Sequence, residues 1–124
     1  IAQIVQTSGW SARQQMMKLL GKAKVVKSLF LIVKSTGDSD SDVRNSAVKA
    51  MKNIISGYEV QYAGQGLINK MEDLYRSGGW NVRMNAIKVL GATKNPNARH
   101  IIYDALDDSD SDVRAAAKKA LRNM

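Results

Sequence analysis

The chain has 124 residues, no cysteine, one proline and a formal net charge of +8. This length suits one domain, 1–124, which buries roughly two-thirds of the surface of its unfolded form. The absence of cysteine excludes disulfides, thiolate zinc sites and cysteine nucleophiles, and it fits a reducing, cytoplasmic location.

Composition also favours packed helices. Phe, Trp and Tyr supply only 6% of the residues, so Ala, Leu, Ile, Val and Met are expected to fill the core. The longest apolar run, 29–33, is far shorter than the ~20 residues of a membrane span. We therefore expect no membrane association. The basic balance indicates anionic partners without naming them.

The second half of the sequence repeats the first. Gly9–Ile54 aligns with Gly79–Met124 without a gap, and 19 of the 46 pairs are identical. We call this the internal alignment. The stretch D-S-D-S-D-V-R, at 38–44, returns unchanged at 108–114. Self-similarity at a fixed period predicts a repeat architecture, in which neighbouring units bury one another's apolar faces.

A shorter unit lies within each half, and each copy of it begins at an arginine. Apolar residues stand one position before each arginine and three, six and seven positions after it. These positions fall on one stripe of a helix. This pattern predicts four amphipathic helices, at about 10–21, 41–56, 80–91 and 111–123. The arginines are Arg13, Arg44, Arg83 and Arg114.

Partner helices are predicted between them, at 24–35, 65–77 and 97–106. Asn95-Pro96 suits the start of the last one, because a proline at the first helical position gives up only an N–H without an intrahelical partner. Ile1–Thr7 is expected to be a truncated partner helix. The predicted repeats are about 1–21, 22–56, 57–91 and 92–124.

The interval from Arg44 to Arg83 is longer than the other two by eight residues, which we place at 57–66. Insertions in repeat proteins map to loops on one face, often a binding face. A longer connection or an extra helical turn is the simpler interpretation. We expect Tyr58 and Tyr62 to be exposed there, as candidate contacts for a partner.

Short helix pairs with an Asp-rich turn, then Val-Arg, Ala three positions on and Leu seven positions on, resemble HEAT repeats of the short type also found in phycobilisome lyases. The resemblance implies an all-α, right-handed α-solenoid of antiparallel helix pairs (HEAT-like or ARM-like) with about 3.5 repeats. The arginine-led helices would line its concave side. At Trp10 and Trp80 the Asp-rich turn is replaced by G-W, so an Asp–Arg pair cannot form locally at Arg13 and Arg83.

The Asp-rich turns also resemble a calcium loop, but two key positions do not fit. The sixth position requires Gly and has Val43 or Val113, and the twelfth requires a bidentate Glu and has Lys49 or Lys119. Capping is the better interpretation, because an acid at a helix start accepts hydrogen bonds from free N–H groups and suits the helix dipole. The acids concerned include Asp38, Asp42, Asp108 and Asp112.

Two recurring basic positions have different expected roles. The four arginines are expected to be structural, each reaching carboxylates or carbonyls of the turns. The lysine five residues after each arginine points away from the apolar stripe, and stacking would place these lysines ~10 Å apart. Such a ladder could hold a phosphate backbone or an acidic protein segment, although exposed helix positions also favour lysine without any ligand. The candidate ladder is Lys18, Lys49, Lys88 and Lys119, flanked by Lys52 and Arg122.

Nothing in the sequence predicts catalysis, a metal site or a cofactor. His100 is the only histidine and is expected at the surface. Trp10 and Trp80 are expected to cover the ends of partner helices, with stacking on a ligand as the alternative.

The sequence therefore predicts a non-enzymatic binding scaffold. A protein is the first choice of partner, and nucleic acid along the lysine ladder is the alternative. An enzyme or lyase subunit rests on family analogy alone. The terminal helices are expected to be exposed, so packing between copies, end to end or as a homo-oligomer, is a further expectation.

Overall fold

The computed structural model describes the backbone of residues 10–124 and the side chains of residues 23–124. The expected helix end at 1–7 lies outside the described residues, as do the side chains of Trp10, Arg13 and Lys18. Within the described range the chain forms helices and no strand.

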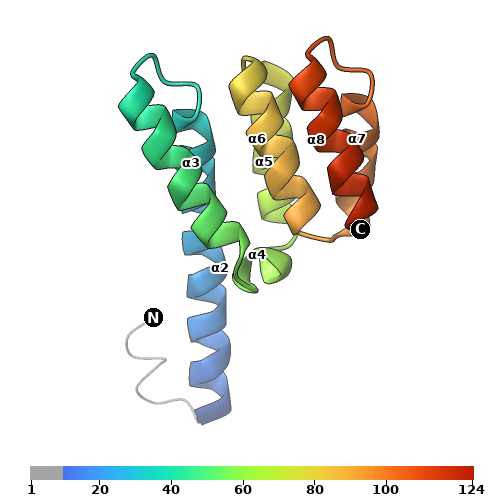
Figure 1. The fold of residues 1–124 in the computed structure, drawn as a ribbon. Coiled ribbons are helices and arrows are strands. Elements are labelled where there is room, and N and C mark those ends of the chain that lie inside the picture. Colours follow the sequence, from blue (N-terminus) through green and yellow to red (C-terminus); the bar gives the residue numbers. More distant parts are fainter. Residues whose placement is uncertain (1–9) are drawn as a thin grey trace.

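The helices stack in chain order in two layers (Figure 1). One layer contains α3, α6 and α8, and the other contains α2, α5 and α7. The predicted all-α solenoid of stacked helix pairs is confirmed, and most helix bounds agree with the predicted ones to within a residue or two. The elements are α2 (Trp10–Ser35), α3 (Ser41–Ile55), α4 (Glu59–Tyr62), α5 (Gln65–Ser77), α6 (Trp80–Ala92), the 3-10 turn η1 (Pro96–Ala98), α7 (Arg99–Ala105) and α8 (Ser111–Arg122).

One predicted boundary is wrong, because 10–21 and 24–35 form a single helix, α2. In the second half of the chain the corresponding break occurs at Lys94, which has a left-handed φ of 52°, and at Asn95. Asn95 is the N-cap of the 3-10 turn that begins at Pro96. At the aligned positions 24–26 the chain has Lys-Val-Val. Since these residues lack the cap and the proline, the helix continues through them.

The core lies between the two layers and is built from the predicted apolar stripes. The apolar residues that face the core are buried on both layers, as are Ala86, Val89 and Leu90 on α6. In 65–77 and 97–106 they are Leu67, Met71, Leu74, Tyr75, Ala98, Ile101, Ile102 and Ala105. Val43 is an exception, because it lies on the predicted stripe but is 42% exposed. The largest fully buried side chains are Leu29, Val33, Met51, Val60, Leu67, Ile68, Met71, Ile87, Val89, Leu90, Ile101 and Ile102.

The eight-residue insertion forms α4, one helical turn between α3 and α5. Val60 of α4 is fully buried, while Tyr58 and Tyr62 are 76% and 65% exposed, as predicted. α4 packs against α2, α3 and α6. The insertion therefore fills space between the first helix pair and the next instead of forming an open loop.

α6 and α8 approach each other closely at Gly91. A Cβ at this position would lie 2.7 Å from the Cβ of Ala120, which is closer than side-chain atoms pack. α8 is also the helix with which α6 makes its most extensive contact. Glycine at 91 thus allows the close packing of these two helices.

The Asp-rich turns cap α3 and α8 in the same way. The Oδ1 atom of Asp40 accepts hydrogen bonds from the N–H groups of Asp42 and Val43, at 2.8 and 3.1 Å. Asp110 does the same for Asp112 and Val113, at 2.9 and 3.1 Å. The N-caps are therefore Asp40 and Asp110, while Asp42 and Asp112 lie in the first turns of α3 and α8.

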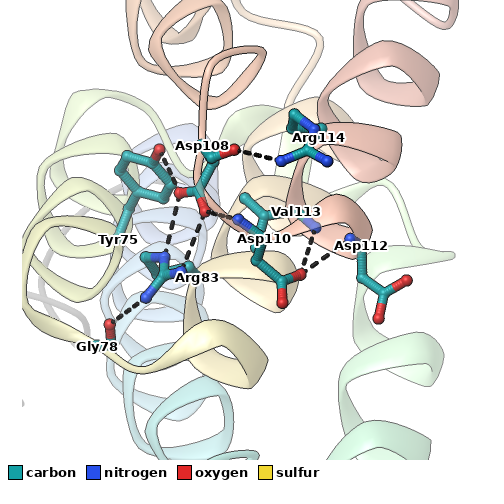
Figure 2. A network of polar contacts seen from close by, with 8 residues as sticks. All are labelled: Tyr75, Gly78, Arg83, Asp108, Asp110, Asp112, Val113 and Arg114. Atoms are coloured by element: carbon teal, nitrogen blue, oxygen red, sulfur yellow. Dashed lines mark hydrogen bonds and ion pairs between the residues drawn. The ribbon is translucent and has the colours of Figure 1, made fainter.

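The Asp108 carboxylate connects three helices (Figure 2). It accepts two hydrogen bonds from Arg83 of α6, at 3.0 and 3.1 Å, and one from the hydroxyl of Tyr75 of α5, at 2.8 Å. The N–H of Asp110 donates a fourth, at 2.9 Å. Arg114 donates to the Asp108 carbonyl at 2.7 Å. The carboxylate thus joins the pair α5–α6 to the turn before α8.

The sequence excluded a local Asp–Arg pair at Arg83, and the structure supplies the acid from the following repeat. Arg83 also donates to the Gly78 carbonyl at 3.1 Å. Among the described residues, Arg44 donates instead to the carbonyls of its own turn, Asp38 and Ser39, at 2.9 and 3.1 Å. Arg44, Arg83 and Arg114 therefore reach carboxylates or carbonyls of turns, and Arg83 does so across repeats.

The network shifts the pKa values of its members. Burial raises the pKa of the Asp108 carboxyl, but the hydrogen bonds from Arg83, Asp110 and Tyr75 outweigh burial, so the pKa lies below its ordinary value. Burial and the bond to Asp108 raise the pKa of Tyr75 to about 12. The Asp108 side chain is 6% exposed and remains ionised at neutral pH.

We predict that Asp108→Ala lowers the free energy of unfolding by about 3 kcal/mol, because it leaves the partly buried Arg83 without its counter-ion. Asp104→Ala is the matched control. It removes an ion pair to Arg76 whose two side chains are about half exposed, and it should cost less than about 1 kcal/mol. Urea unfolding at pH 7 measures both losses. Equal losses would contradict the role given to Asp108.

Candidate functional site

A groove lies where α3, α6 and α8 meet, and four lysines line it. Its volume is about 580 Å³. We call it the lysine groove and define it by Lys52 of α3, Lys88 of α6, Lys94 after α6 and Lys119 of α8. The apolar part of its wall includes Met51, Ile55, Ala92 and Ala116.

The lysine groove contains part of the predicted ladder. Lys88 and Lys119 line it as the sequence suggests, and Lys52, predicted only as a flanking residue, joins them. Lys49 and Arg122 are exposed outside the lining. On α3, therefore, Lys52 lines the groove and Lys49 does not. Lys52 lies eight residues after Arg44, and Lys49 lies five residues after it.

Lys94 is the member that sequence reasoning missed. It follows the C-cap of α6, Thr93, and its positive φ turns the chain at the edge of the groove. A signal was present, because Lys24 and Lys94 are an identical pair in the internal alignment. The helix pattern gave Lys94 no face, since it lies in the predicted connection between 80–91 and 97–106.

Lys88 is at the electrostatic centre of the groove. Its pKa is lowered, first by partial burial and then by the positive charges of Lys52 and Lys119, while Asp112 acts weakly in the opposite direction. No acidic side chain is among the described residues that line the groove. The cluster therefore carries positive charge that no carboxylate in the lining neutralises, which suits it to an anionic group.

The other predicted contact residues lie elsewhere. Tyr58 and Tyr62 lie on or next to α4 and are exposed. Trp80 is 46% exposed, so it covers its neighbours only in part. His100 is at the surface as predicted, with Nε2 3.8 Å from Oε2 of Glu72. Their binding roles stay predictions.

Within the described residues, no group of three or more His, Asp or Glu side chains is placed to hold a metal ion. No helix in that part of the chain combines the length and apolar character needed to cross a membrane.

Comparison with known proteins agrees with the stacked helix pairs. A family model described as HEAT repeats matches residues 61–122, half of the chain. No curated protein and no solved structure matches the chain. The narrower resemblance to the phycobilisome-lyase type of repeat stays a prediction.

We predict that Lys88→Met raises the free energy of unfolding by about 0.5 kcal/mol at low salt. The lowered pKa means that the folded chain holds the Lys88 proton less tightly than the unfolded chain, so the charge opposes folding below its ordinary pKa. Methionine keeps the length of the side chain and removes the repulsion. Thermal unfolding at low and high salt measures the gain, which salt should reduce. Lys118→Met, outside the groove, should give no gain. A loss of stability with Lys88→Met would contradict this account.

Proposed function

This chain belongs to the HEAT-repeat family, and we propose that it is a non-enzymatic scaffold whose lysine groove holds an acidic segment of a protein partner. HEAT repeats generally serve as protein-interaction scaffolds. The observation that carries the proposal is the meeting of Lys52, Lys88 and Lys119 from three helices around one hollow.

Electrostatics supports an anionic ligand. Lys88 is partly desolvated and repelled by its neighbours, so a carboxylate placed among the three ammonium groups would relieve the repulsion and raise the pKa of Lys88 again. The approach of an acidic segment would also be accelerated by the positive field of the groove. Binding should therefore be sensitive to salt.

The shape and lining of the groove favour a protein over a nucleic acid. Ile55 and Ala92, which are half-buried, offer apolar surface beside the ammonium groups, and this combination suits a peptide that carries both an acid and an apolar side chain. A phosphate backbone instead uses a continuous track of cations. The lysines here surround one hollow, and Lys49 does not extend them along α3.

Tyr58 and Tyr62 are proposed as further contacts. Both are more than half exposed, and α4 begins a few residues after Lys52 and Ile55, which line the groove. Tyrosine contributes large contact area at low entropic cost in binding surfaces. A partner that fills the groove and continues over α4 would bury them.

The proposal is tested by fluorescence anisotropy with three labelled probes: an acidic peptide containing one leucine, the same peptide with serine in place of leucine, and a single-stranded oligonucleotide of equal charge. We expect the leucine peptide to bind most tightly. Changing Lys52, Lys88 and Lys119 together to Glu should weaken its binding at least tenfold, since each lost charge pair is worth about 1 kcal/mol.

The matched control changes Lys27, Arg99 and Lys118 to Glu. These residues are exposed and lie outside the groove, and the triple change alters the net charge by the same amount. An equal loss of binding in both triple variants would show that net charge alone matters and would overturn the site. Tighter binding of the oligonucleotide at every salt concentration would favour the nucleic-acid alternative.

A further inference from the structure

A second groove lies between α2 and α3, and it is mainly apolar. Its volume is about 480 Å³. Leu31 and Val43, two of the large apolar side chains in its lining, are 53% and 42% exposed. We call it the α2–α3 groove and define it by six of its lining residues: Leu31, Ile32, Ser35, Val43, Ser46 and Ala47.

The same six positions are covered in the second half of the chain. The internal alignment places them on α7 and α8, where every one is buried. There α6 packs against both helices. The aligned residues are Ile101, Ile102, Ala105, Val113, Ala116 and Ala117.

The segment that corresponds to α6 is present in the first half but does not reach this groove. Residues 10–21 share Trp, Arg, Lys, Leu and Gly with α6 at five aligned positions. They form the first part of α2 and project beyond the other helices (Figure 1). Residue 13 precedes Ser35 by 22 positions in this helix, a distance of about 33 Å along its axis. While α2 stays continuous, the segment cannot cover the groove of its own chain.

The turn beside the groove also lacks an ion pair that its counterpart in the second half of the chain has. Arg83 and Asp108 form the bidentate ion pair that joins α6 to the turn before α8. Their aligned counterparts are Arg13 and Asp38. The Asp38 carboxylate accepts a hydrogen bond from the Asp40 N–H at 2.8 Å. No basic side chain among the described residues forms a salt bridge with it.

We propose that the α2–α3 groove binds residues 10–21 of a second copy of this chain, and that two copies exchange these segments reciprocally. Two α2 helices would run antiparallel, so that the first part of each covers the groove of the other. Arg13 of each copy would bind Asp38 of its partner as Arg83 binds Asp108. Such an exchange reproduces contacts that the second half of the chain makes internally, and a twofold arrangement satisfies both grooves at once. The lysine groove takes no part in it.

The first experiment measures the mass of the unchanged chain by light scattering over a range of concentrations. We expect a dimer, and we expect Arg13→Glu and Asp38→Arg each to weaken the dimer at least tenfold. An equimolar mixture of these two variants should form a heterodimer, because the introduced glutamate of one then meets the introduced arginine of the other, and the unchanged Arg13 meets the unchanged Asp38. Lys49→Glu, outside the groove, is the control and should leave the dimer intact.

The outcomes distinguish a second copy from closure within one chain. Suppose that the mixture of the single variants stays monomeric, while a chain carrying both Arg13→Glu and Asp38→Arg is a monomer as stable as the unchanged chain. This result would show that the segment folds back onto its own chain, and it would overturn the exchange. A wild-type chain that is monomeric at all concentrations would overturn it as well.

A second variant tests the continuity of α2. Val25→Asn with Val26→Pro introduces the residues that cap and begin η1 at the aligned positions, Asn95 and Pro96. The break should allow residues 10–21 to turn back onto their own groove, so we expect a monomer with unchanged helix content by circular dichroism. A dimer of undiminished stability would overturn the proposal.

Discussion

The carboxylate of Asp108 joins elements that are far apart in the sequence, and the second half of the chain depends on it. Tyr75, Arg83 and the turn before α8 all meet at this one group. A pair of short helices has too little interior to bury its apolar face alone, so its fold depends on the next pair. The apolar faces supply most of the contact, and the Asp108 network fixes how the two pairs are aligned.

Most of the fold could be predicted from the sequence because helix periodicity is a local property. The stripes around Arg44, Arg83 and Arg114 indicated which side of each helix is buried, and the Asp-rich turns indicated where α3 and α8 begin. The continuity of α2 was not predicted, although Val25 and Val26 stand where Asn95 and Pro96 begin the turn η1 in the second half of the chain. Similarity between the halves suggested a break that these two residues do not make.

The site was less predictable, since it depends on how the helices are spaced. A regular stack would have placed Lys49 in line with Lys88 and Lys119. The inserted turn α4, with Val60 in the core, lies against both α3 and α6, and Lys52 instead of Lys49 lines the groove with the other two. Likewise the partner of Arg83 comes from the following repeat, and a pattern counted within one repeat cannot contain it.

The close approach of Gly91 to Ala120 has a mechanical consequence. The Cβ of Ala120 packs against Gly91 there, so we expect α6 and α8 to move together, while α3 is held by its contacts with α2 and α4. Flexing of the stack would then concentrate at α4 and would change the separation of Lys52 from the other two groove lysines. We therefore expect the width of the groove to change with the curvature of the stack. A molecule that binds all three ammonium groups would then restrict the bending of the solenoid.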